Sequence, residues 1–174
     1  MTSAVKMRIS KLKLLLLMAM SLFGLWASSM VVVVYWWLKA ALPGCTPTSQ
    51  TFFGLRINCD AVLGSVYSQI YGVPLELFAV VYFVINLALV YLIAFGSESV
   101  FRRSLTVLFG WRFIGLVIVP YLVSLEVFII QAICIYCTVM HIAIILDFII
   151  ISYFLFYKKN SLFPDEATAA AAPA

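Results

Sequence analysis

"AICIYCTVMH", residues 132–141, places two cysteines three positions apart at the start of a long apolar run, and the chain's single histidine follows four residues after the second cysteine. The run covers Ile133–Tyr157 and exceeds the ~20 residues that a helix needs to cross a hydrocarbon core. Over the whole chain, 66% of the residues are hydrophobic and 10% are charged. Because soluble domains are about half apolar and a quarter charged, the sequence predicts an integral membrane protein.

Three further apolar segments have a similar length: Leu14–Leu38, Leu75–Phe95 and Leu105–Ile130. The predicted fold is therefore an all-α integral membrane protein, a four-transmembrane-helix bundle formed by residues 1–159. A cysteine-containing outer loop, residues 39–74, joins the first two helices. The first segment is too long for the apolar core of a signal peptide, so we interpret it as an uncleaved helix. Residues 160–174 have low complexity and are expected to form a disordered tail.

Basic residues predict the orientation of the bundle. They precede the first helix, lie between the second and third, and follow the fourth: Lys6, Arg8, Lys11, Lys13, Arg102, Arg103, Lys158 and Lys159. Because loops rich in Lys and Arg remain in the cytoplasm, both termini are predicted to be cytoplasmic and residues 39–74 to face outward. The net charge of +4 therefore indicates topology and not binding to nucleic acid.

All four cysteines are then expected at the outer face, Cys45 and Cys59 in the loop and Cys134 and Cys137 at the start of the last helix. An even number of cysteines on the oxidising side of a membrane predicts disulfide chemistry. Cys134 and Cys137 are neighbours on one helix face, where the positive end of the helix dipole favours a thiolate. A loop pair beside a helix pair suggests a relay of electrons between two disulfides.

Other interpretations of the cysteines remain open. A zinc site would use the Cys-x-x-Cys, but Cys45 and Cys59 lack the spacing typical of metal ligands, and no metal cofactor is expected. A haem attachment motif is excluded because Thr138 follows Cys137. A four-helix membrane scaffold with purely structural disulfides and a metal-binding membrane protein are the alternative functions. Redox chemistry is favoured, because Cys-x-x-Cys thiols at helix N-termini are typically reactive.

Several polar residues lie within the apolar segments. His141 is one turn below Cys137, about 6 Å deeper along the helix axis, and is interpreted as a donor to a ligand such as a quinone, with a helix-to-helix hydrogen bond as the alternative. Asp147 is expected to pair with Arg112, and Glu76 and Glu126 are interpreted as interfacial carboxylates. Gly24 and Ser28 form a small-xxx-small pattern that predicts a helix contact.

Two motifs together resemble a known family. "CDAVLGSVYSQIYGVP", residues 59–74, and "CIYC", residues 134–137, are similar to the loop and the last helix of the vitamin K epoxide reductase family, particularly its bacterial and archaeal members. The resemblance implies a bundle that encloses a quinone near Cys137. It also implies that a separate thioredoxin-like protein delivers electrons to Cys45–Cys59, and that Cys134 exchanges with a loop cysteine. Such a thiol:quinone oxidoreductase supports disulfide bond formation.

The resemblance also implies the residues of the quinone site. Ser65 corresponds to a hydroxyl near the quinone, and Leu63 and Phe78 to apolar residues of the pocket wall. Many relatives have Asn at the start of the second helix, where this chain has Leu75 and Glu76, and a Tyr at the position of His141. We therefore expect His141 and Ser65 to bind the quinone, which favours simple quinone reduction over reduction of an epoxide.

The resemblance also bears on the partner and the membrane. The loop cysteines are more widely spaced than in the vertebrate enzymes, and no thioredoxin domain follows the last helix, so the partner is expected to be a separate protein. The quinone would be of the menaquinone (vitamin K) or ubiquinone type. The resemblance favours a prokaryotic plasma membrane, with the endoplasmic reticulum membrane as the alternative.

Overall fold

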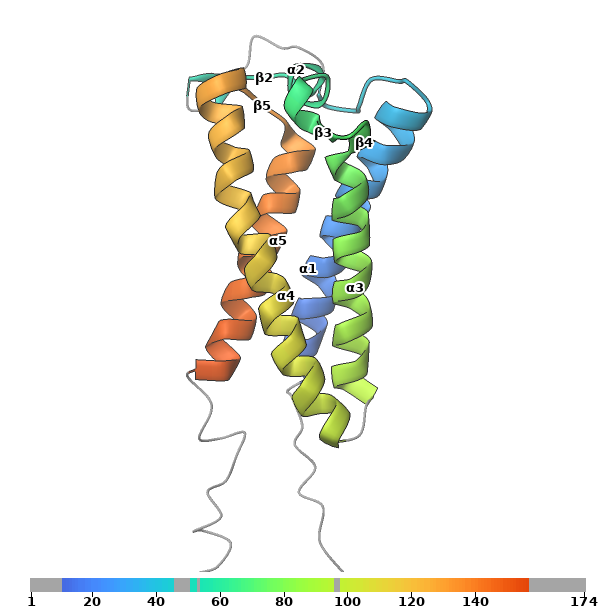
Figure 1. The fold of residues 1–174 in the computed structure, drawn as a ribbon, viewed down its shortest axis with the longest axis vertical. Coiled ribbons are helices and arrows are strands. Elements are labelled where there is room, and N and C mark those ends of the chain that lie inside the picture. The colour runs from blue at the N-terminus through green and yellow to red at the C-terminus, as the bar shows by residue number, and fades with distance from the viewer. Residues whose placement is uncertain (1–10, 46–50, 53, 96–97, 157–174) are drawn as a thin grey trace, which may run out of the picture.

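Four long helices run side by side in the computed structural model, which describes residues 11–45, 51–52, 54–95 and 98–156 (Figure 1). They are α1 (Lys11–Met30) with its π-helical continuation η1 (Val31–Trp37), α3 (Leu75–Phe95), α4 (Glu98–Ser124) with its π-helical continuation η3 (Leu125–Ile130), and α5 (Ile135–Phe156). Each contains a stretch long and apolar enough to cross a membrane: Leu14–Trp37, Leu75–Phe95, Arg103–Ile130 and Ile135–Tyr153. The predicted all-α membrane bundle is thereby confirmed.

The outer surface of the bundle is as apolar as a lipid environment requires. Large hydrophobic side chains that are about half exposed occur on all four helices, among them Leu22, Phe23, Val84, Ile118 and Ile149. In hydrocarbon each backbone polar group must be paired within the protein, and a helix achieves this without help from its neighbours. In water, these side chains would expose a large apolar surface to the solvent. The exposed apolar belt is therefore consistent with a bilayer around the helices.

Close packing joins α1 to α3 near the middle of the bundle. A Cβ atom at Gly24 would collide with the ring of Phe83, which is fully buried. One turn later, the hydroxyl of Ser28 donates to the carbonyl of Gly24, so this polar group is paired within its own helix (2.9 Å). The helix contact predicted at Gly24 is confirmed, because only a residue without a side chain admits the ring there.

The segment between α1 and α3 folds over one end of the bundle (Figure 1). It contains β1 (Thr51–Phe52), β2 (Leu55–Ile57), α2 (Cys59–Leu63), η2 (Val66–Ser68), β3 (Gln69–Ile70) and β4 (Val73–Pro74). Strand β2 pairs antiparallel with β1 and parallel with β5 (Ala132–Ile133), the strand just before α5, while β3 and β4 form a hairpin that leads into α3. The sheet therefore ties the loop to the start of the last helix.

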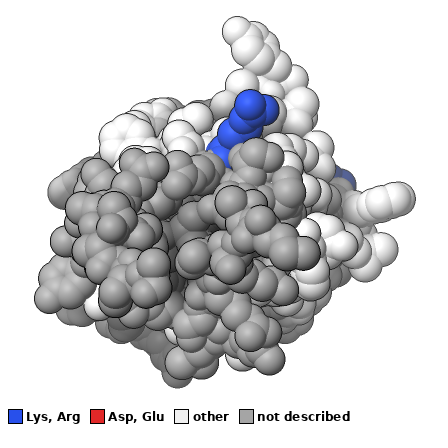
Figure 2. All heavy atoms as spheres, turned by 90° about the horizontal axis from the view of Figure 1, so that it is seen from below, with Lys and Arg blue, Asp and Glu red and all other residues white. Residues whose placement is uncertain are grey.

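The opposite end of the bundle is where α1 begins and α5 ends (Figure 1). Seen from this end, Lys or Arg atoms are in view among the described residues, and Asp and Glu atoms are not (Figure 2). This distribution agrees with the charge asymmetry of the sequence. The basic residues predicted to flank the helices at Lys6, Arg8, Lys158 and Lys159, and the predicted tail of residues 160–174, lie outside the described residues.

Candidate functional site

The four cysteines gather beneath the loop at one end of the bundle. Cys45 and Cys59 form a disulfide with their Cα atoms 5.4 Å apart, whereas Cys134 and Cys137 are free thiols, and all four are buried. The sulfur atoms of Cys45, Cys59 and Cys134 all lie within 4.8 Å of one another. Because two of these sulfurs are bonded to each other, the cluster is arranged for exchange between a thiol and a disulfide.

Local backbone structure explains why Cys59 and Cys134 meet. Strands β2 and β5 run parallel, and the N–H of Asn58 donates to the carbonyl of Ile133 (3.1 Å). Cys59 follows Asn58 and Cys134 follows Ile133, so the pairing of these two segments brings the two cysteines side by side. The side-chain oxygen of Asn58 also accepts from the N–H of Ala61 (3.1 Å), and this N-cap fixes the start of α2 at Cys59.

The loop cysteine Cys45 is held from the side of α5. The hydroxyl of Tyr136 donates to the carbonyl of Pro43 (3.1 Å), and the N–H of Cys45 donates to the carbonyl of Leu42 (3.1 Å). Tyr136, which precedes Cys137 in the sequence, is itself buried. The start of the last helix therefore positions both its own Cys134 and the loop disulfide.

Cys134 occupies the N-terminal boundary of α5. Its sulfur accepts a hydrogen bond from the N–H of Cys137 (3.3 Å), and its carbonyl accepts from both the N–H and the hydroxyl of Thr138 (2.9 Å each). Cys134 thus lies at the head of the helix, with its sulfur within 4.8 Å of both sulfurs of the loop disulfide.

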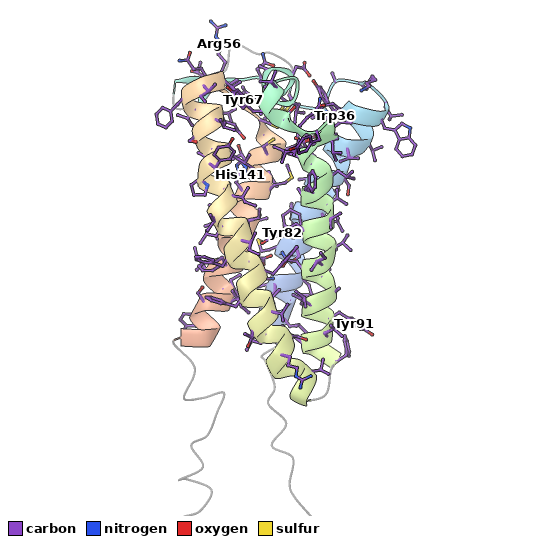
Figure 3. The ribbon with its side chains drawn as sticks, in the orientation of Figure 1. Trp36, Arg56, Tyr67, Tyr82, Tyr91 and His141 are labelled. Atoms are coloured by element: carbon purple, nitrogen blue, oxygen red, sulfur yellow. A yellow bond between two sulfur atoms is a disulfide. The ribbon has the colours of Figure 1, made fainter. Side chains whose placement is uncertain are left out.

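Cys137 faces a different space, a cavity between α3, η3 and α5 with about 610 Å³ of volume not filled by protein atoms, its open side included. The side chains that line it are mostly apolar: Val62, Ser65, Tyr67, Ser68, Leu75, Glu76, Ala79, Leu122, Leu125, Glu126, Ile130, Cys137, Met140, His141 and Ile144. His141 lies one helical turn below Cys137, and Figure 3 shows it beneath Tyr67 and Trp36, away from the loop end. A mainly apolar wall with a few polar groups suits a small organic ligand.

Two buried carboxylates belong to the lining of this cavity. Glu76, in the first turn of α3, is 5% exposed, and Glu126, in η3, is 6% exposed. Glu76 accepts a hydrogen bond from the indole N–H of Trp36 (3.1 Å), and Glu126 accepts one from the N–H of Cys134 (3.5 Å). Their interpretation as interfacial carboxylates is wrong, because both side chains turn inward from the ends of their helices.

A comparison with models of protein families finds a match to the vitamin K epoxide reductase family over residues 15–152, a range that includes all four cysteines. The chain belongs to this family. The resemblance of its two cysteine motifs is thereby confirmed, and membership implies a membrane thiol–quinone oxidoreductase that uses quinone substrates. A comparison with curated proteins finds no match.

The residues expected from the family to form the quinone pocket are only partly brought together. Ser65 and His141 line the cavity with Cys137. Phe78 does not, because it lies about 200° around α3 from the inward-facing Glu76 and is 51% exposed on the outside of the bundle. Leu63 is fully buried in the core beside the cysteines and does not line the cavity either.

The cavity also differs from the family pattern at the start of α3. Leu75 and Glu76, which stand where many relatives have Asn, both line it. The hydroxyl of Ser65 donates to the carbonyl of Val62 (2.8 Å), so this hydroxyl is engaged within the loop. His141 therefore has the more available donor, and among the described residues no hydrogen bond fixes its imidazole.

A second polar group lies in the half of the bundle away from the cysteines. Arg112 and Asp147 form an ion pair (3.4 Å) with both side chains fully buried, which confirms their predicted pairing. The hydroxyl of Ser21 donates to the Asp147 carboxylate (3.0 Å), and Nε of Arg112 donates to the side-chain oxygen of Asn86 (3.5 Å). Each of the four helices contributes one of these residues, so the group connects the whole bundle.

Proposed function

We propose that this family member transfers electrons from a thioredoxin-like protein through Cys45–Cys59 and Cys134–Cys137 to a membrane quinone, and so supports disulfide bond formation. In the first exchange, two thiols of the partner reduce the Cys45–Cys59 disulfide, and the partner leaves oxidised. In the second, the loop thiols reduce a Cys134–Cys137 disulfide and re-form their own. The reduced Cys134 and Cys137 then give two electrons and two protons to the quinone, which becomes a quinol.

The observation that carries this proposal is the separation of the two Cys-x-x-Cys sulfurs. Cys134 lies within 4.8 Å of both sulfurs of the loop disulfide, while Cys137 lines the cavity. A hydrophobic quinone reaches a thiol from within the bilayer, and a protein disulfide is reached from outside it. A pair of thiols that faces both sides can therefore join the two half-reactions, and the transfer of electrons between them is a disulfide exchange.

The cavity supports a quinone as the acceptor. Its wall is mainly apolar, which suits a ring with an isoprenoid tail of the menaquinone or ubiquinone type. His141 offers a hydrogen bond to one carbonyl oxygen, and Ser65 offers another when its hydroxyl turns from the carbonyl of Val62 to the quinone. In this role Cys137 is the thiol that reacts with the quinone. Leu63 supports the site from the core behind the cysteines, and Phe78 lies outside it.

The same proposal assigns the orientation. The basic flanks of the helices support a cytoplasmic location for the end without cysteines. The loop and the disulfide would then face the oxidising side, where a thioredoxin-like partner is available. The favoured location is a prokaryotic plasma membrane. Since Cys45 and Cys59 are buried, the partner reaches their disulfide only when the loop opens.

Quinone reduction by the purified protein tests the proposal, with either a reduced thioredoxin-like protein or dithiothreitol as the electron donor. We expect the wild type to turn over with both donors and Cys137→Ala with neither. Cys45→Ala should lose turnover with the protein donor and retain turnover with dithiothreitol, because a small dithiol can reduce Cys134–Cys137 directly. Equal activity of all three proteins would show that the cysteines are structural and would refute the relay.

A further inference from the structure

Glu126 is an acidic side chain in an unusual place, because it is buried in a membrane-spanning segment and lines the same cavity as Cys137. An isolated carboxylate in such a position is costly unless it has a partner or a function. Among the described residues the single ion pair joins Arg112 to Asp147, so no basic side chain there compensates Glu126. Packing alone gives no reason for an acidic residue at this position.

The hydrogen bonds of Glu126 connect it to the cysteine pair. One carboxylate oxygen accepts from the N–H of Cys134, and the sulfur of Cys134 accepts from the N–H of Cys137. Glu76, the other carboxylate in the cavity, accepts its hydrogen bond from the indole N–H of Trp36 and none from a cysteine. Of the two acids, Glu126 is therefore the one beside the thiols.

The reaction between thiols and a quinone requires a carrier for protons. Two S–H bonds break and two O–H bonds form, yet the sulfur atoms and the quinone oxygens meet in a mainly apolar cavity. A carboxyl group in contact with both can accept a proton from one and donate it to the other.

We propose that Glu126 carries protons from the Cys134–Cys137 thiols to the quinone, an inference that rests on the proposed function. The Glu126 carboxylate accepts a thiol proton and leaves a thiolate. As the bond between the two sulfurs forms, their electron pair passes to the quinone ring. The Glu126 carboxylic acid donates its proton to a quinone oxygen and then transfers the second thiol proton to the other oxygen. The products are one disulfide, one quinol and the original carboxylate.

Glu126→Gln separates proton transfer from structure. The amide oxygen of Gln can still accept the hydrogen bond from Cys134, but the amide does not carry a proton at neutral pH. Glu126→Asp keeps the acid on a shorter side chain. Asp60→Asn makes the same chemical change at an exposed residue of α2 and is the matched control.

The measurement is the rate at which protein pre-reduced with dithiothreitol, and then freed of it, reduces the short-chain quinone ubiquinone-1 in a single turnover. We expect Glu126→Gln to be slower than wild type by about 100-fold, in the range of general acid–base effects. Glu126→Asp should recover part of the rate, formate should partly restore Glu126→Ala, and Asp60→Asn should match the wild type. Alkylation of Cys134 and Cys137 by iodoacetamide in each variant verifies that the thiols are intact.

Two results would overturn the inference and leave the relay in place. One is a Glu126→Gln protein as fast as the wild type. The other is an equal loss in Glu126→Gln and Glu126→Asp without rescue of Glu126→Ala by formate, which would indicate a structural role. If instead the wild type fails to reduce the quinone, or Cys137→Ala reduces it as well, the proposed function itself is refuted.

Discussion

Cys134 and Cys137 are separated by only two residues, yet they face different surroundings. Cys134 lies against the loop disulfide, and Cys137 lines the cavity. An i, i+3 pair shares one side of a helix, so this division depends on the elements packed above and beside the first turn of α5 and not on the helix alone. The sequence predicts the Cys-x-x-Cys pair, and the structure shows that its two side chains face different surroundings.

This division predicts which cysteine can be trapped. In Cys137→Ser, a disulfide between Cys134 and Cys45 or Cys59 should accumulate, because the residue that would resolve it is missing. Proteolysis of the non-reduced protein followed by mass spectrometry would detect the linked peptides. In Cys134→Ser, no link between Cys137 and the loop should form. A link in the second variant and none in the first would reverse the assignment of the two thiols.

The buried ion pair predicts a distinctive response to substitution. Asp147→Leu leaves the Arg112 guanidinium without its carboxylate in the middle of the bundle, which should lower the free energy of unfolding by about 3 kcal/mol. Arg112→Met combined with Asp147→Leu should be less destabilised than Asp147→Leu alone, because no unpaired charge remains. Thermal unfolding of the detergent-purified proteins measures both. Additive losses in the double variant would show that the pair is not coupled.

The sequence identifies part of the site and misses part of it. Cysteine spacing and the position of His141 in an apolar run are local signals. In the structure, three of the cysteines gather beneath the loop, and His141 lines the cavity together with the fourth, Cys137. Glu76 and Glu126 are near the ends of their apolar segments, where a sequence alone does not distinguish a carboxylate that faces the interface from one that turns inward. Their presence within 20-residue apolar windows is the signal that could have identified them.

At the level of elements, the loop between the first two helices is more regular than its sequence indicates. Strands of two or three residues have no measurable alternation, so the pairing of β2 with β5 was not predictable from periodicity. This pairing delays the start of the last helix to Ile135, after a strand at Ala132–Ile133. It also places the Asn58 cap and Cys59 directly above Cys134.

The cap of α2 should control access to the loop disulfide. Asn58→Ala removes the side-chain oxygen that accepts from Ala61 and should cost about 1 kcal/mol of local stability. Because Cys45 and Cys59 are buried, their reduction requires local opening, and this loss should accelerate their reduction by dithiothreitol about five-fold. The rate is measured by alkylation of the released thiols. Asn58→Asp retains an acceptor oxygen and should stay close to wild type; equal acceleration in both variants would show that the cap is unimportant.

At the level of the whole molecule, hydropathy alone predicts the four-helix bundle, because length and apolar content suffice to define membrane-spanning segments. The arrangement of the helices follows from less visible features. A glycine admits Phe83 between α1 and α3, and a four-residue polar group joins all four helices in their buried centre. The sequence predicts the pair of Arg112 and Asp147, but not that Ser21 and Asn86 join it or that Phe83 packs on Gly24, because these partners are distant in sequence.

The orientation of the whole bundle can be tested with a membrane-impermeant maleimide on intact cells. Native cysteines are buried or joined in a disulfide, so a new cysteine at an exposed position gives the signal. Tyr71→Cys, in the exposed turn of the loop, should be labelled without permeabilisation. Phe95→Cys, at the opposite end of α3, should be labelled only after it. The reverse pattern would place the loop in the cytoplasm.

The measurement that tests the relay most directly is the number of quinols formed by fully reduced protein in the absence of any further donor. Under anaerobic conditions, reduced wild type holds two cysteine pairs and should form two molecules of quinol for each protein molecule. Cys45→Ala, which retains only the Cys134–Cys137 pair, should form one, and Cys137→Ala should form none. Formation of only one quinol by the wild type, or of any quinol by Cys137→Ala, would contradict the transfer of electrons from the loop pair through Cys137.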